Sequence, residues 1–316
     1  MARQEGMAVI SALLIAAVVA VIAAGMIERQ GLLTRQVENR QLALQGQWAL
    51  EGGLQLSRQV LLEQRLRDPL VRGGQPWSQP MRDVPSGSVR FYGQLEDEQG
   101  KFNLRNLVVD GQVDAEALAT FQRLCALIGI NERLATAIAG QVIDSYPQRP
   151  LATPSNPGLG LDSGRATSPS SNSEALPARR PMLRSVEALA GLKGMDGEAL
   201  ARLRRFVTVL PALTWVNGNT ASAEVLAAQV PGLSLQQAAA LVAERDGGRW
   251  FINRGDFVNR LRMPSLAMAN VRVGINSDWF RLRGLARLGT RELALQALLR
   301  QREGQLPDII WRRVGA

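Results

Sequence analysis

The sequence predicts an α+β fold in which a long N-terminal helix packs on a small antiparallel sheet and a large α-helical domain is inserted into that sheet. An uncharged apolar run near the amino terminus continues directly into an amphipathic pattern with helical spacing. Strand-like alternation occurs at residues 88–107 and again at 279–314, on both sides of a long helical stretch. Since strands at both ends of a helical block can join one sheet, we expect the block to be an insertion.

The composition excludes several kinds of chemistry. The 316 residues include no histidine, so catalysis with an imidazole base and histidine-ligated zinc or haem sites are excluded. The single cysteine, Cys125, cannot form an internal disulfide or a cysteine metal cluster. The net charge of +9 is a modest excess for this length. Since the sequence also offers no nucleophile with a base and no phosphate-binding glycine loop, we expect a protein that is not an enzyme.

The N-terminal apolar run predicts a membrane anchor. No charge occurs from Met7 to Ile27, and as a helix this run would be roughly 30 Å long, which matches the hydrocarbon core of a bilayer. A cleaved secretory signal is the alternative, because the small residues Ala23 to Gly25 could provide a cleavage site. The apolar part of such signals is about 7 to 15 residues long, so the length of the run favours an anchor that is retained.

The pattern after the anchor predicts a continuation of the same helix. Apolar residues alternate with Arg, Glu and Gln from Ile27 to Leu66 without a proline, and Pro69 ends the pattern. We therefore expect one helix over residues 7–68, of which 7–27 span the membrane. An anchor followed by a separate juxtamembrane helix is the alternative.

The junction of Gly6 with Met7, followed by this helix, resembles type IV pilin-like proteins. The resemblance implies that a prepilin peptidase removes residues 1–6 and that the new amino terminus at Met7 is methylated. Most members carry Glu at the fifth mature position, where this chain has Ser11. A carboxylate inside a bilayer costs at least about 2.5 kcal/mol unless it is paired, and in the family it is thought to pair with the next subunit towards the tip. Ser11 therefore fits a subunit with nothing beyond it.

The segment 88–107 predicts two short strands joined by a turn at Asp97 to Gly100, with the acids Asp97 and Glu98 in solvent. Its block Asp-Glu-Gln-Gly-Lys-Phe-Asn-Leu, residues 97–104, is similar to a block of the K-type minor pseudopilins (GspK) of type II secretion systems. The K-type subunit is also the pseudopilin that typically lacks the membrane-embedded Glu and is placed at the tip.

The middle of the chain predicts helices over 114–143 and 184–210, separated by a loop at 145–181 that is rich in Pro, Ser, Gly and Asn. In the family this region is linked to calcium binding. Calcium takes about six to eight oxygen ligands, so the scattered acids Asp144, Asp162 and Glu174 are weak candidates for such a site. We expect no other cofactor.

The segment from Trp215 to Leu261 resembles both the second helical repeat of K-type pseudopilins and helix-hairpin-helix (SAM-like) DNA-binding units. The DNA-binding units use a pair of glycines on the hairpin to bring backbone amides to a phosphate. Here Gly232 is followed by Leu233 and Ser234, so the second glycine is missing. We expect a helical packing module that does not bind nucleic acid.

Three further strands are predicted at 279–285, 293–298 and 309–314. The whole chain then divides into a leader at 1–6, the N-terminal helix at 7–68, an α/β core at 69–111 and 276–316, and an inserted helical domain at 112–275.

The resemblance implies a minor pseudopilin at the tip of a periplasmic pseudopilus. It would cross the bacterial inner membrane once, with its C-terminal head in the periplasm, and would start or cap assembly with I-type and J-type minor pseudopilins and, as a further candidate, an H-type subunit. Secreted proteins and the outer-membrane secretin are further expected contacts. The alternatives are a type IV pilus minor pilin, which the large insertion disfavours, and a membrane-anchored DNA receptor of the competence type.

Overall fold

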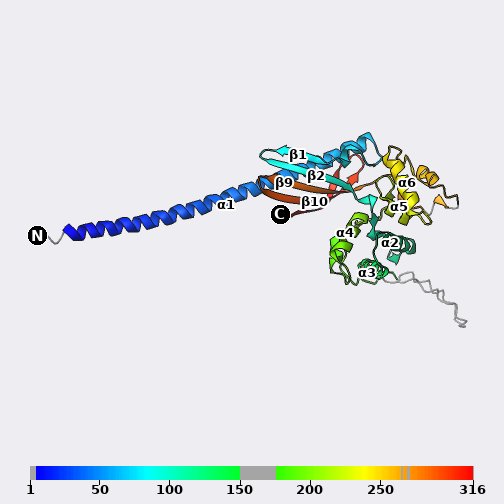
Figure 1. Cartoon of the computed structure of the whole chain (residues 1–316), viewed down its shortest axis with the longest axis horizontal. Helices are drawn as coiled ribbons and strands as arrows, with labels where there is room; N and C mark the ends of the chain where they lie inside the picture. The colour runs from blue at the N-terminus through cyan, green and yellow to red at the C-terminus, as the bar shows by residue number, and fades with distance from the viewer. Residues whose placement is uncertain (1–4, 150–175, 265, 269–270, 316) are drawn as a thin grey trace, which may run out of the picture.

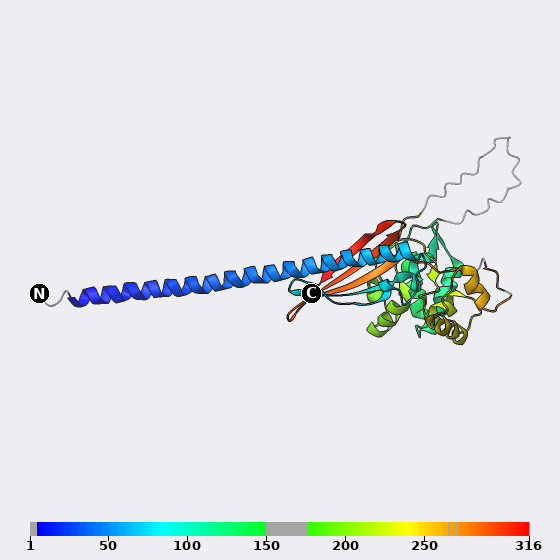
Figure 2. The ribbon, with the colours of Figure 1, turned by 90° about the horizontal axis from the view of Figure 1, so that it is seen from above.

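The computed structural model describes residues 5–149, 176–264, 266–268 and 271–315. A single helix, α1 (Glu5–Arg67), projects far out of a head that contains the rest of the described chain (Figure 1). The prediction of one continuous helix, without a break after the apolar run, is confirmed. Figure 2 shows that the second half of α1 lies along the sheet, while the helical region lies at the end of the head farthest from the amino terminus.

The head contains a five-stranded antiparallel sheet with the strand order β1-β2-β9-β10-β11. Strands β9 and β2 pair directly, although almost the whole helical region separates them in the sequence. The sheet therefore joins the two segments that the sequence analysis assigned to it. Its strands are β1 (Met81–Ser86), β2 (Val89–Asp97), β9 (Trp279–Leu288), β10 (Arg291–Arg302) and β11 (Gln305–Gly315).

One face of the sheet is covered by α1. Along β2, residues alternate between buried and more exposed positions, as expected for a strand with one face in the core. The facing side of α1 contributes Ala49, Leu50, Leu54 and Leu61, each at most 3 % exposed. The amphipathic half of α1 is therefore held by burial of its apolar face, while the first half has no such cover in the described structure.

The contact of α1 with the sheet at Phe91 depends on glycine. The ring of Phe91 is 1 % exposed and lies against Gly53 of α1, Gly93 of β2 and Gly284 of β9. A Cβ atom at Gly53 would come within 2.2 Å of the Phe91 ring, whereas one at Gly52 would meet nothing within 4 Å. The absence of a side chain at Gly53 is therefore what allows the helix to reach the sheet.

This contrast gives a matched pair of variants. Gly53→Ala should lower the free energy of unfolding by about 1–3 kcal/mol, because the new methyl group overpacks the Phe91 ring. Gly52→Ala should raise it by about 0.5–1 kcal/mol, because alanine is the better helix former and the site is open. Urea unfolding of the full-length protein in detergent measures both changes, and a stabilising effect of Gly53→Ala would contradict the packing described here.

The helical region between β2 and β9 has one core of its own. It is built from small helices, most of which begin with a side-chain cap, and from short strand pairs at its boundary. We propose that residues 112–275 form the insertion and that 69–111 and 276–316 complete the α/β core, which the pairing of β2 with β9 supports. Before β1 the chain forms η1 (Pro76–Ser78). The elements between β2 and β9 are η2 (Glu98–Gly100), β3 (Phe102–Asn103), η3 (Leu104–Leu107), β4 (Val108–Val109), β5 (Gln112–Val113), α2 (Ala115–Leu127), α3 (Glu132–Ile143), η4 (Val186–Gly191), α4 (Gly197–Phe206), β6 (Val207–Thr208), β7 (Val216–Asn217), α5 (Ala223–Gln229), α6 (Leu235–Asp246), α7 (Arg254–Arg260) and β8 (Val273–Gly274).

One sequence-based expectation is wrong. The strand expected around Phe102 and Leu104 was to pair with the strand before it, across a solvated turn. In the structure β3 has two residues and pairs in parallel with β6, which lies in the helical region. The hairpin partner of β2 is instead β1, across a tight turn at Gly87, whose φ is +60°.

Candidate functional site

The first half of α1 is an exposed apolar surface. Large side chains such as Ile10, Leu14, Val21 and Ile27 are between 66 % and 73 % exposed. Within the described residues, α1 is the one helix that is long and apolar enough to cross a membrane. An uncharged surface of this length is unstable in water, so it needs lipid or other apolar helices around it.

The predicted processing and assembly residues lie at the beginning of this helix. Gly6 and Met7 belong to the first turns of α1, and Ser11 follows Met7 by about one turn. The Ser11 side chain is exposed, and no charge accompanies it up to Ile27. The structure therefore places these three residues at the far end of the rod, away from the head (Figure 1).

The acid pair that the sequence analysis placed in solvent is buried instead. Asp97 is 6 % exposed, and its Oδ2 accepts hydrogen bonds from the hydroxyls of Ser277 and Thr220, both at 2.6 Å, and from Asn217 Nδ2 at 3.0 Å. Its Oδ1 accepts from the backbone N–H of Gln99 at 2.8 Å. Burial raises the pKa of the Asp97 carboxyl, and these four hydrogen bonds oppose that rise.

Glu98 is fully buried and is held by two cations. Its carboxylate lies 3.1 Å from Lys101 Nζ and 2.9 Å from Arg281 Nη2, and it also accepts a hydrogen bond from the Thr208 hydroxyl. Because Arg281 lies on β9 and Thr208 on β6, this one side chain connects the sheet to the helical region. A buried carboxylate is tolerated here because it is paired and hydrogen-bonded.

Glu96 extends this charged cluster towards solvent. Its carboxylate lies 2.8 Å from Lys101 Nζ and 3.3 Å from Arg283 Nη2. Burial alone would raise the pKa of Glu96, but Lys101 and Arg283, with Arg281 nearby, hold the pKa below its usual value. The cluster is thus an alternating set of acids and cations from β2, from β9 and from the turn that follows β2.

The rest of the block 97–104 continues the same connection. Asn103 Nδ2 donates to the Ala212 carbonyl at 2.8 Å, and Asn103 Oδ1 accepts from the Leu210 N–H at 3.1 Å. At Gly100, a Cβ would come within 3.1 Å of the backbone oxygen of Thr220, so a side chain would push the two segments apart. The block therefore fixes the helical region on the end of β2.

The partners of Asp97 were missed by the sequence analysis as a group. Asn217, Thr220 and Ser277 lie 120 to 180 positions farther along the chain. The sequence did single out the segment around Thr220, but as part of a helical repeat, without a link to the acids. A close family of sequences in which these positions vary together is the signal that could have found the link.

The calcium candidates do not form a site in the described part of the chain. Asp144 ends α3, where its Oδ2 lies 3.6 Å from Arg180 Nε and its carbonyl accepts from the N–H groups of Arg179 and Arg180. Asp162 and Glu174 lie outside the described residues. Among the residues that are described, no three acids or cysteines come together in a way that could hold a metal. Asp144 is the one candidate of the three that the structure describes, and the calcium site stays a prediction.

The hairpin near Gly232 is also built as a packing module. The backbone amide at Gln237 is already bonded to the Ser234 side chain in a capping box at the start of α6. Arg249, a basic side chain of the same segment, has its Nη1 3.5 Å from Glu244 Oε2. The flanking Leu226 and Leu233 are buried in the helical core.

Two family models match the middle of this chain. Residues 100–212 and 216–276 match two family models, both described as type II secretion system (T2SS), protein K. The type II secretion system protein K of Pseudomonas aeruginosa is 30 % identical over 96 % of this chain and 91 % of its own length. The chain belongs to the type II secretion system protein K family. The protein K of Pectobacterium carotovorum is 27 % identical over 99 % of this chain and 97 % of its own length.

A solved structure from a type II secretion system shares the fold. A chain in the crystal structure of the GspK-GspI-GspJ complex from enterotoxigenic Escherichia coli matches with a TM-score of 0.64 and 18 % identity, over 89 % of this chain and 99 % of that one. The α+β fold and the resemblance to K-type pseudopilins are both confirmed. The chain is therefore a minor pseudopilin of a type II secretion system, and a DNA receptor is not favoured.

Proposed function

We propose that this minor pseudopilin caps the tip of the periplasmic pseudopilus, with α1 as its anchor in the bacterial inner membrane. One observation carries the proposal: the exposed apolar half of α1 has Ser11 where a subunit with another one beyond it would carry a carboxylate. The head would then lie in the periplasm.

The anchor would act by burial alone. Before assembly the surface from Met7 to Ile27 lies in lipid, and after assembly the same surface packs among the helices of neighbouring subunits. Both environments are apolar, and no side chain of this surface is charged, so transfer between them desolvates no charged side chain. A carboxylate at residue 11 would need the amine of a subunit farther along, and a tip subunit has none.

Processing would prepare this surface. Cleavage by a prepilin peptidase after Gly6 removes Arg3 and Glu5, which are the charged groups that precede the apolar run. The mature chain then begins at Met7, where methylation of the new amine would follow.

The partners follow from the relative of known structure. In that crystal structure GspK forms a complex with GspI and GspJ, and we propose I-type and J-type minor pseudopilins as the neighbours of this chain. An H-type subunit, the exported protein and the outer-membrane secretin are further contacts that a tip position would allow. The wide head, whose helical region is held to the sheet through the cluster around Glu98, would leave no room for another subunit on top.

The tip position can be tested by labelling. Cys125 is 1 % exposed, and burial raises the pKa of its thiol to about 12, so a cysteine introduced at the exposed Arg133 would be the reactive one. Gold particles coupled to Arg133→Cys in isolated pseudopili should appear singly at one end. The unsubstituted chain is the control for reaction at Cys125. Particles distributed along the shaft would contradict the proposal.

A further inference from the structure

The last strand of the sheet has an open edge. Strand β11 pairs with β10 on one side, and the sheet ends there (Figure 2). The backbone groups on its other side are therefore available to a further strand. Near the start of β11, Arg58 of α1 donates to the Pro307 carbonyl at 2.7 Å, which leaves residues 310–314 as the free part of the edge.

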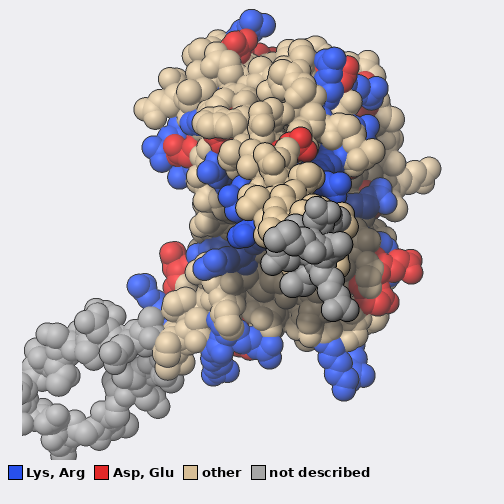
Figure 3. All heavy atoms as spheres, turned by 90° about the vertical axis from the view of Figure 1, so that its left-hand side faces the viewer, with Lys and Arg blue, Asp and Glu red and all other residues tan. Residues whose placement is uncertain are grey.

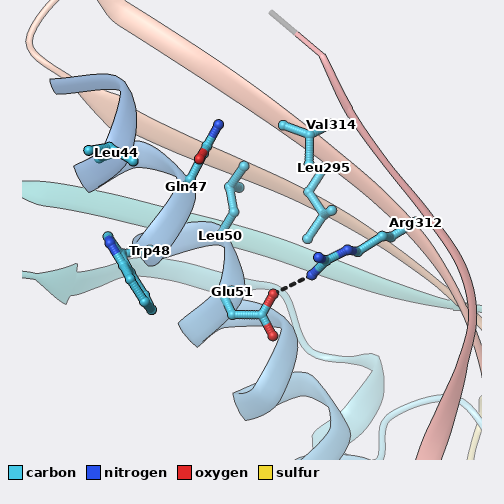
Figure 4. A pocket seen from close by; sticks show the side chains of 8 residues that line it. All are labelled: Leu44, Gln47, Trp48, Leu50, Glu51, Leu295, Arg312 and Val314. Atoms are coloured by element: carbon cyan, nitrogen blue, oxygen red, sulfur yellow. Dashed lines mark hydrogen bonds and ion pairs between the residues drawn. The ribbon is translucent and has the colours of Figure 1, made fainter. Parts of the chain in front are cut away.

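A first apolar groove lies beside this edge on the face covered by α1. It has a volume of about 390 Å³ and runs between α1 and the end of β11. Figure 4 shows Val314 and Leu295 on one side of it and Leu50 on the other, with the ion pair of Glu51 and Arg312, 2.6 Å apart, at its end. Val314 is 50 % exposed. An additional strand beside β11 would reduce this exposure.

A second groove lies beside the same edge on the opposite face. Its volume is about 440 Å³, and it lies between β11 and the helical region. Leu210 forms its apolar floor together with Leu298, and Met182, at 60 % exposed, stands at its rim. Trp311 of β11 lines the wall. The two grooves therefore flank one strand, one on each face.

The charged side chains around this edge are mainly basic. Arg184 and Arg313 line the second groove, and neither forms an ion pair with an acid of the described chain. Arg313 lies over the Trp311 ring at 5.2 Å instead. On the face of the head that looks towards the anchor, basic side chains are also more numerous than acidic ones (Figure 3). A partner with acidic groups would meet uncompensated positive charge here.

A second copy of this chain is a poor occupant. Antiparallel pairing of two β11 strands would bring Arg312 and Arg313 of one chain close to the same residues of the other. Like charges on paired strands are destabilising, and charged residues on an edge are a common protection against such self-association.

We propose that β11 accepts an extended segment of a partner protein as a sixth strand of the sheet. Because side chains of a strand point alternately to its two faces, successive residues of the segment would enter the two grooves in turn. Acidic residues next to this apolar stretch would face Arg184 and Arg313. The backbone would supply affinity, and the grooves and arginines would supply selectivity for an apolar segment with acidic flanks. This proposal does not depend on the tip position.

The test uses the full-length protein in detergent and a fluorescent peptide with the sequence Asp-Val-Leu-Val-Leu-Asp. Fluorescence anisotropy should show saturable binding that weakens with salt. Two further peptides carry N-methyl groups on alternate amides. One of them should lose binding, because its methyl groups face β11, and the other should bind like the parent. Equal binding of both methylated peptides, or of a peptide with Lys in place of Asp, would overturn the proposal.

Variants locate the site on the protein. Arg184→Glu and Arg313→Glu should each weaken peptide binding about tenfold, because an attraction becomes a repulsion. Arg82→Glu makes the same charge change on the opposite edge strand, β1, and should leave the affinity within about twofold. Circular dichroism spectra identify any variant that fails to fold. An effect of Arg82→Glu as large as that of Arg313→Glu, or a dimer through β11 that excludes the peptide, would contradict strand addition at this edge.

Discussion

Glu98→Ala should lower the free energy of unfolding of the head by about 3–5 kcal/mol. The carboxylate of Glu98 is completely buried between Lys101 and Arg281, which are themselves less than 10 % exposed. Removal of the acid would take away the ion-pair partner of Arg281 and leave Lys101 with Glu96 alone, and Arg281 Nε already has no hydrogen-bond partner in the described structure. The loss is therefore the cost of uncompensated buried charge, in addition to the lost hydrogen bond of Thr208.

Urea unfolding, followed by tryptophan fluorescence of the full-length protein in detergent, measures this change. Glu292→Ala is the matched control, since Glu292 lies 2.6 Å from Arg287 in the same sheet but both side chains are about half exposed. Its effect should be far smaller, because water solvates the remaining charge. Equal effects of the two variants would mean that the cluster around Glu98 does not hold the helical region on the sheet.

Ser11→Glu should strongly reduce the amount of this protein at the pseudopilus. A carboxylate buried among apolar helices without a partner costs at least about 2.5 kcal/mol, which corresponds to a decrease on the order of 50-fold in the assembled population. Ser11→Ala is the matched control and should assemble within about twofold of the unsubstituted chain, since it adds no charge.

The measurement is the ratio of this subunit to the major pseudopilin in isolated pseudopili, by quantitative immunoblotting. Normal assembly of Ser11→Glu would mean that the new carboxylate pairs with the terminal amine of another subunit nearer the tip. A further subunit would then lie above this one, contrary to a tip position.

The long helix could be predicted from sequence because its signals are local. The uncharged run at 7–27 and the helical spacing after it each extend over several turns, and Pro69 marks where they stop. The three C-terminal strands were predictable for the same reason, since alternation and the glycines at 289 and 304 separate them. Such signals do not depend on what the rest of the chain does.

The environment of the acids at 97–98 could not be predicted in this way. A window around Asp97 shows two acids before a glycine, which is typical of a solvated turn. Their burial is decided by Asn217, Ser277 and Arg281, which pack on the turn from distant parts of the chain. The pairing of β3 with β6 could not be predicted for the same reason, because no local pattern predicts which strand a two-residue segment will pair with.

The candidate sites also differ in whether they depend on local sequence or on the tertiary structure. Gly6, Met7 and Ser11 form a linear motif, so the sequence was enough to predict their role, and that role stays a prediction. The open edge of β11 and the two grooves beside it depend on the order of strands and on the position of the helical region. The strand itself was predicted at 309–314, but its place at the margin of the sheet was not.

The central claim is that the apolar segment from Met7 to Ile27 remains part of the exported subunit. The intact mass of the protein purified from membranes tests it most directly, with tandem mass spectrometry of the N-terminal peptide. We expect a chain that begins at Met7 with a methylated amine, and a Gly6→Ala variant that keeps residues 1–6. A mature chain that begins after Gly25 would show that the segment is a cleaved signal, and the account of an anchored tip subunit would be wrong.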